Sequence, residues 1–351
     1  MRLFREPEPT RIRCAPFRRG LEADPVGTAG NYDAFVVVES PLPWGRDATQ
    51  CWPFVELGWS GPFLAGADGR RWRPVVVARG PLGGSVGEDP ASTVTVWERP
   101  AAGGGPYRSR RWWATHPEEV PDLVRSVVDG TRDGPDPEAP PTLHLCTHGR
   151  RDVCCGSMGT SLFDGVQLVD QPAGPVGSGR PVELWRCSHT GGHRFAPTGI
   201  TFPDGLVWGH LTPVLVCELA ERAAWTAERR PVPPPSPELV AACRGSSSLP
   251  EGPAQVADRA AWVRFGWGWV DADRSVTVDG PVPSGPDDPP VRVVLEGPLG
   301  GGALLVGVAD RVPTPTCGIE GPFGPGGDVP DEPVWRVLDA EWSTGAVAVR
   351  Q

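Results

Sequence analysis

The chain has 351 residues and a formal net charge of -10, and all 33 of its basic residues are arginine, because lysine is absent. Without lysine the chain can form neither a Schiff base nor a Walker-type phosphate loop, and its acidic balance argues against nucleic acid and for a basic protein surface as partner. The amino terminus lacks the apolar core of a secretion signal, and no run of about 18 apolar residues could span a bilayer, so we expect a cytoplasmic protein with no membrane contact.

The first block, residues 1–130, is predicted to be an α/β domain. Runs rich in β-branched residues are typical of buried strands, and they occur at 34–39, 74–78 and 93–97. A helix is expected over 117–129, where apolar residues share one face and Gly130 provides a C-terminal stop. Residues 131–141 have the composition of a linker.

The middle block, residues 142–230, has an α/β order of elements. The sequence predicts strand 142–146, helix 157–169, strand 181–187, hairpin 198–210 and helix 213–229. The last helix begins with Thr212 as a capping hydroxyl and Pro213 at the first helical position. Residues 231–237 are rich in proline and predict a stiff linker.

The third block, residues 238–351, is expected to be a small α+β domain of unknown role. A helix is predicted at 254–263, and strands at 291–295 and 303–308. The Trp-rich segment 265–269 suggests either a docking surface or, as we favour, aromatic packing. Cys317 is most simply a lone thiol.

The middle block concentrates the side chains that bind soft metals. Four of the nine cysteines and four of the six histidines lie between residues 144 and 193. Cys146 ends a predicted strand and Cys155 opens a helix, whereas His189 and His193 follow the next strand. Gly191 and Gly192 allow the backbone between the histidines to pass close to a bound group. Thiolates and imidazoles are the ligands of zinc and of iron-sulfur clusters.

At these residues the sequence resembles a known family. The segments are Cys-Thr-His-Gly-Arg-Arg-Asp-Val-Cys-Cys-Gly at 146–156 and Ser-His-Thr-Gly-Gly-His-Arg-Phe-Ala-Pro at 188–197. They are similar to the sucrase/ferredoxin-like family, thioredoxin-like ferredoxins with a His-x-Gly-Gly-His motif, over roughly residues 10–225. The resemblance implies a thioredoxin-like 2Fe-2S ferredoxin domain at 142–230, preceded by a related or degenerate α/β half.

The resemblance also implies a ligand set and a function. A 2Fe-2S cluster would be bound by Cys146, Cys155, His189 and His193. Cys154 stays an alternative to Cys155, although the spacing and Gly156 favour Cys155. Supporting roles in the loops or strands are expected for His144, His148, Arg151, Asp152 and Arg194, and Cys187 and Cys217 are expected to be core residues.

The expected function is electron transfer or redox response with an unknown redox partner protein, and no catalytic residue is assigned. Histidine ligands leave the cluster less negative than four thiolates would, so its potential should exceed that of plant-type ferredoxins, and imidazole protonation should couple electron to proton transfer. Two alternatives remain open, a structural Cys2His2 zinc protein and a thiol-disulfide oxidoreductase. The second would favour a Cys-x-x-Cys motif rather than the vicinal Cys154-Cys155.

Overall fold

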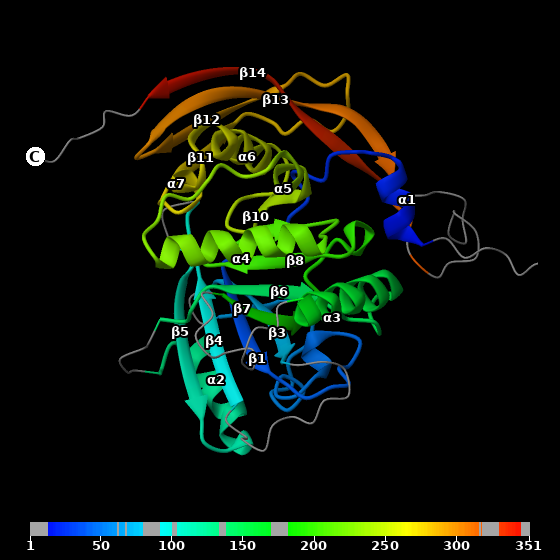
Figure 1. The fold of residues 1–351 in the computed structure, drawn as a ribbon, viewed down its shortest axis with the longest axis vertical. Coiled ribbons are helices and arrows are strands. Elements are labelled where there is room, and N and C mark those ends of the chain that lie inside the picture. The colour runs from blue at the N-terminus through cyan, green and yellow to red at the C-terminus, as the bar shows by residue number, and fades with distance from the viewer. Residues whose placement is uncertain are drawn as a thin grey trace, which may run out of the picture.

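The computed structural model describes residues 13–61, 63–66, 69–79, 92–99, 104–132, 138–169, 182–315, 317 and 330–344. They form a mixed α/β protein with one large curled sheet and a second, four-stranded sheet (Figure 1). The strand order of the large sheet is β10-β9-β8-β6-β7-β3-β1-β4-β5, with β2 (Leu64–Ala65) beside β3. Among these described residues, no helix is both long and apolar enough to cross a membrane.

The two halves of the large sheet have the same strand order and the same strand directions. In the first half, β1 (Ala34–Glu39) lies between β3 (Arg71–Ala78), which is parallel, and β4 (Ser92–Glu98), which is antiparallel and pairs with β5 (Arg108–Ala114). In the second half, β6 (Thr142–Cys146) lies between parallel β7 (Glu183–Cys187) and antiparallel β8 (Gly199–Phe202), which pairs with β9 (Leu206–Trp208). Antiparallel pairing of β3 with β7 joins the halves. The two predicted blocks on either side of residues 131–141 therefore share one sheet.

The large sheet curls so that the inner faces of its two halves pack against each other. Trp97 of β4 stacks on Phe202 of β8 with ring centroids 4.7 Å apart, and Phe35 of β1 meets the same ring edge-on at 5.0 Å. Because β8 and β1 are separated by three strands in the sheet order, these contacts require curvature. Ring pairs in these arrangements add to the stabilisation from apolar burial.

Helices cover the outer faces of the sheet, and they pack on it with the apolar faces that the sequence predicted. Helix α2 (Val120–Val128) buries Leu123, Val124 and Val127 against the first half. Helices α3 (Thr160–Val169) and α4 (Pro213–Ala227) pack on the second half. The Thr212 Oγ1 accepts a hydrogen bond from Leu215 N at 3.4 Å, which confirms the predicted N-terminal cap of α4. The helices and strands predicted for the first two blocks are confirmed within a few residues at each end.

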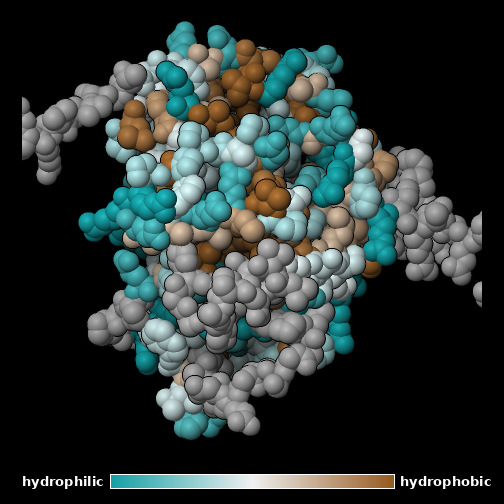
Figure 2. Space-filling model, in the orientation of Figure 1, coloured by the Kyte–Doolittle hydropathy of each residue, from teal (hydrophilic) through white to brown (hydrophobic). Residues whose placement is uncertain are grey.

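The carboxy-terminal region adds a small sheet that packs on helix α6 (Pro253–Phe265). Its four antiparallel strands are β11 (Ser275–Asp279), β12 (Val291–Gly297), β13 (Gly300–Pro313) and β14 (Asp331–Thr344). Trp267 and Trp269, in α7 (Trp267–Val270), are buried, and the Trp269 indole donates to Asp258 Oδ1 at 2.9 Å. The Trp-rich segment is therefore packing, as the sequence favoured. Apolar side chains also gather on the outside of the molecule over this sheet, at the top of Figure 2, and its exposed residues include Leu305 and Leu338.

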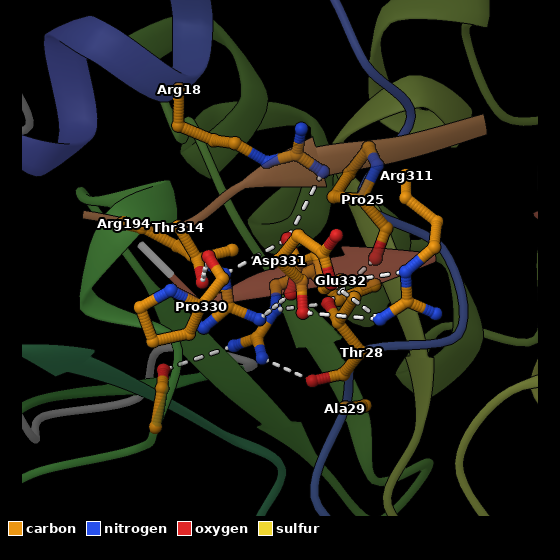
Figure 3. A network of polar contacts seen from close by, with 12 residues as sticks. Arg18, Pro25, Thr28, Ala29, Arg194, Arg311, Thr314, Pro330, Asp331 and Glu332 are labelled. Atoms are coloured by element: carbon orange, nitrogen blue, oxygen red, sulfur yellow. Dashed lines mark hydrogen bonds and ion pairs between the residues drawn. The ribbon is translucent and has the colours of Figure 1, made fainter. Parts of the chain in front are cut away.

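Two connections hold the carboxy-terminal region to the large sheet. Short helix α5 (Pro237–Ala242) leads into β10 (Cys243–Ser246), which pairs with β9 and so extends the large sheet. At the start of β14, Glu332 forms ion pairs with Arg18 of α1 (Cys14–Gly20) and Arg194 (Figure 3). The Proline-rich segment 231–237 is fixed to α4, since Glu218 accepts hydrogen bonds from Ser236 N and Oγ at 2.8 and 2.6 Å.

Candidate metal centre

The site lies where parallel strands β6 and β7 end together. Register pairing sets Cys146 opposite Cys187, so the chain leaves both strands at the same edge of the sheet. The loop after β6 carries residues 147–154, and the loop after β7 carries His189 and leads to the short helix η4 (His193–Phe195). Thr147 N donates to Cys187 O at 3.2 Å, and Cys146 N donates to Thr198 O at 2.9 Å. These backbone bonds bring the two predicted ligand loops side by side.

Close backbone contacts explain the glycines in the first loop. A Cβ on Gly159 would lie 1.9 Å from the carbonyl oxygen of Cys146, and one on Gly156 would lie 2.3 Å from the Cα of Gly149. The π-helical turn η3 (Cys155–Gly159) therefore packs directly on the end of β6. Asp152 Oδ1 accepts hydrogen bonds from Cys154 N and Cys155 N at 2.8 and 3.3 Å. The carboxylate thus fixes the start of this turn, which is the bracing role expected for Asp152.

Three of the four predicted ligands come together at this edge. The thiol of Cys146 lies close enough to the Cys155 thiol and to the His189 imidazole for each to shift its pKa. The contact with Cys155 holds the pKa of Cys146 well below its usual value, and it correspondingly raises the pKa of Cys155. Burial lowers the pKa of His189, which favours the neutral imidazole that binds metals. Both cysteines are buried.

The fourth predicted ligand, His193, faces a different set of groups. Its Nδ1 lies 3.1 Å from Cys14 Sγ and 3.0 Å from Asp152 Oδ2. The two glycines before it have positive φ angles of 88° and 67°, and a Cβ on Gly192 would lie 2.4 Å from the guanidinium carbon of Arg244. Arg244 Nη1 donates to Gly191 O at 3.0 Å, so a buried arginine holds this turn in place.

A second group of donors surrounds Cys154. Its Sγ lies 3.1 Å from Cys317 Sγ and 3.8 Å from Cys14 Sγ, and Cys317 and Cys14 are themselves 3.1 Å apart. Ligand atoms of these three cysteines and Asp152 all lie within 4.8 Å of one another, so the four residues could hold a metal ion. Cys317 is therefore not the lone thiol expected from the sequence. It lies against two other thiols because the chain after β13 returns to the amino-terminal helix α1.

The donor types at Cys146, Cys155 and His189 suit an iron-sulfur cluster or zinc, but within the described residues the ligand atoms of these three are not close enough together to hold a single ion. Thiolate and imidazole are ligands of both. The Nδ1 atom of His189 is buried and lacks a hydrogen-bond partner among the described residues, and leaving such an atom unpaired normally costs free energy. The contact of His189 with Cys146 therefore involves the other ring nitrogen, Nε2, which is on the side of a metal held by that thiolate. The close packing of Gly159 on Cys146 also keeps this part of the loop free of side chains.

The remaining residues singled out in the sequence take supporting positions. His148 Nε2 lies 2.7 Å from Gly45 O, Arg151 pairs with Asp47, and Arg194 Nε donates to Glu332 Oε1 at 2.9 Å. His144 is a buried strand residue whose burial lowers its pKa to about 3. Cys187 is buried as expected, but Cys217 is exposed on α4 and is not a core residue.

Cys14 was not predicted to be a site residue, and Cys317 was predicted to be a thiol without a partner. Cys14 lies 140 residues before Cys154, and Cys317 lies 163 residues after it. No spacing rule connects cysteines so far apart. The sequence feature that indicates a second group is the adjacent pair Cys154 and Cys155. Two adjacent thiols in one loop can contact two different sets of residues.

Comparison with known proteins agrees with the resemblance over part of the chain. The model of the sucrase/ferredoxin-like family matches residues 97–231. This range contains both ligand loops and the second half of the large sheet. No curated protein and no solved structure matches the chain.

Proposed function

We propose that the chain is an electron-transfer or redox-responsive protein that carries a 2Fe-2S cluster on Cys146, Cys155, His189 and His193. The observation that supports this most strongly is the contact of Cys146 with both Cys155 and His189 at the shared end of β6 and β7. The family match covers the same loops. The strand order β7-β6-β8-β9, with α3 between β6 and β7 and α4 after β9, supports a thioredoxin-like arrangement for this half.

His193 fits the proposed set through its second ring nitrogen. Its Nδ1 is within hydrogen-bond distance of Asp152 Oδ2, which leaves Nε2 to bind. Metal-binding histidines commonly donate their other ring N–H to a carboxylate, which fixes the tautomer and the ring orientation. Asp152 would thus orient His193 while it also holds the amides of Cys154 and Cys155.

When bound, such a cluster supplies one-electron transfer. The chain's own residues would set how easily the electron enters. Burial of Cys146 and Cys155 keeps water from the thiolates, whereas His193, with a quarter of its side chain exposed, would lie nearest to a redox partner. Each histidine would hold a proton on the nitrogen that faces away from the metal, so that proton uptake could accompany reduction.

The test is metal analysis of protein purified without oxygen. We expect a red-brown protein with about two irons and two acid-labile sulfides per chain, and Cys155→Ser should lose both iron and colour. Cys217→Ser is the matched control, since it makes the same change at an exposed position, and it should retain them. A colourless wild type that binds zinc but no iron after reconstitution with iron and sulfide would favour the structural zinc alternative instead.

A further inference from the structure

The group around Cys154 has the size of a site for one metal ion. In a tetrahedral site with metal-sulfur bonds of about 2.3 Å, the sulfur atoms lie about 3.8 Å apart. The Cys14–Cys154 sulfur-sulfur distance of 3.8 Å equals this spacing, whereas Cys317 Sγ lies closer, 3.1 Å from each of the other two sulfurs. The carboxylate of Asp152 lies within 4.8 Å of all three sulfurs. A cluster of several irons would spread its ligands over several metal atoms. The geometry therefore indicates a single ion.

The surroundings stabilise negative charge on these sulfur atoms. Cys14 N donates to Cys317 Sγ at 3.3 Å, and a backbone amide at Ala15 hydrogen-bonds to Cys154. Metal binding to these cysteines would release their thiol protons.

The fourth donor is available in the same loop. Asp152 Oδ1 is occupied by the amides of Cys154 and Cys155, and Oδ2 remains on the side of His193. Cys14 and Cys154 are completely buried, and Asp152 is nearly so. Four protein donors in a closed, thiolate-rich setting match structural zinc, whereas a catalytic zinc site keeps one position open.

We propose that Cys14, Cys154, Cys317 and Asp152 bind a structural zinc ion, which fastens both ends of the chain to the ligand loop. The ion would join α1, the loop after β6 and the segment after β13 at one point. Nearby, the ion pairs of Glu332 with Arg18 and Arg194 join the start of β14 to α1 and to the loop after β7 (Figure 3). The zinc site goes beyond the proposed electron carrier, because none of its four residues is a proposed cluster ligand.

The site would also hold His193 in place. Its Nδ1 lies within 3.1 Å of both Cys14 Sγ and Asp152 Oδ2, which are two of the four zinc donors. An ion that fixes these atoms fixes the position of the ring between the two groups. The role of zinc here is therefore positioning, with no electron transfer through it.

The test is zinc analysis of the full chain produced with zinc in the medium. We expect about one zinc ion per chain in the wild type. Cys14→Ser and Cys317→Ser should lose it, and Cys217→Ser should keep it. Asp152→Asn should weaken zinc binding while retaining an oxygen that can cap the turn. If Cys317→Ser loses zinc, Cys317→His should restore zinc binding, because histidine is also a zinc ligand.

The outcomes separate this proposal from the proposed cluster. Cys146→Ser should lose iron and keep zinc, so loss of iron alone would leave the zinc site standing. Zinc content that is unchanged in both Cys14→Ser and Cys317→Ser would overturn the proposal. A disulfide between Cys14 and Cys317, or between Cys154 and Cys317, would also overturn the proposal, because it removes two of the ligands. Peptide mapping of zinc-loaded wild type under non-reducing conditions would detect it.

Discussion

At the scale of single residues, the two adjacent cysteines serve different groups. Cys155 contacts Cys146, whereas Cys154 contacts Cys14 and Cys317. Successive residues at the start of a helical turn point in different directions, about 100° apart. This is why a vicinal pair that cannot easily form its own disulfide can supply ligands to two neighbouring sites.

Glycine at position 159 lets the turn that begins at Cys155 approach the end of β6 closely. A Cβ there would overlap the carbonyl oxygen of Cys146, and a backbone atom of a core strand cannot move aside cheaply. We expect Gly159→Ala to destabilise the protein by about 2 kcal/mol or more and to lower its iron content, because the turn must move away from Cys146.

The matched control for this change is Gly165→Ala in the following helix α3, where a Cβ meets nothing within 4 Å. This substitution should stabilise the helix by about 0.5–1 kcal/mol and leave iron unchanged. Urea unfolding and metal analysis of both variants provide the comparison. Equal stability of the two variants would show that the close approach at Gly159 is relaxed in solution.

At the scale of elements, the turn that ends β9 carries a histidine that makes stability depend on pH. Burial, together with the nearby charges of Arg19 and Arg18, lowers the pKa of His210 from 6.5 to about 4. Between these pH values the unfolded chain binds a proton that the folded chain does not. The free energy of unfolding should therefore fall as the pH falls from 6.5 to 4, by at most about 1.4 kcal/mol per pH unit from this residue.

Asparagine at position 210 tests this contribution. His210 has a φ of 52°, which asparagine tolerates better than most residues, and asparagine does not titrate. His210→Asn should therefore reduce the slope of unfolding free energy against pH between 4 and 6.5. The exposed His116 gives the control His116→Asn, whose slope should equal that of the wild type. If the slope of unfolding free energy against pH were identical in the wild type and both variants, His210 would not be the source of the pH dependence.

Across the whole molecule, strand pairing and ion pairs hold the carboxy-terminal region to the rest of the chain. Strand β10 extends the large sheet, and Glu332 of β14 pairs with Arg18, whose side chain is 1% exposed, and with Arg194, the neighbour of His193. Removing one partner of a buried pair leaves a charge without compensation. The pairing therefore links the position of the small sheet to the second ligand loop.

We expect Glu332→Gln to cost about 3–5 kcal/mol in unfolding free energy, because the buried guanidinium of Arg18 loses its partner. Asp331→Asn, one residue away, breaks an exposed pair with Arg311 and should change stability little. Thermal or urea unfolding measures both. A small effect of Glu332→Gln would mean that this contact does not hold the regions together.

The sequence was most informative where a signal is local. The β-branched run of β1, the strand ending at Cys146 and the capped helix α4 agree with the structure because their patterns lie within a few residues. Helix α1 escaped prediction because its sequence, Cys-Ala-Pro-Phe-Arg-Arg-Gly, has no apolar period. The group of Cys14, Cys154 and Cys317 escaped it because its members are brought together only by long-range folding, through the return of the chain after β13.

In the proposed centre, two histidines bind the cluster together with Cys146 and Cys155. The most direct measurement is pulsed electron paramagnetic resonance of the reduced protein labelled with ¹⁵N-histidine, which detects nitrogen nuclei bonded to the paramagnetic cluster. Two strongly coupled histidine nitrogens are expected, one lost in His189→Cys and the other in His193→Cys. A cluster without any coupled histidine nitrogen, or with couplings unchanged in both variants, would contradict the assignment.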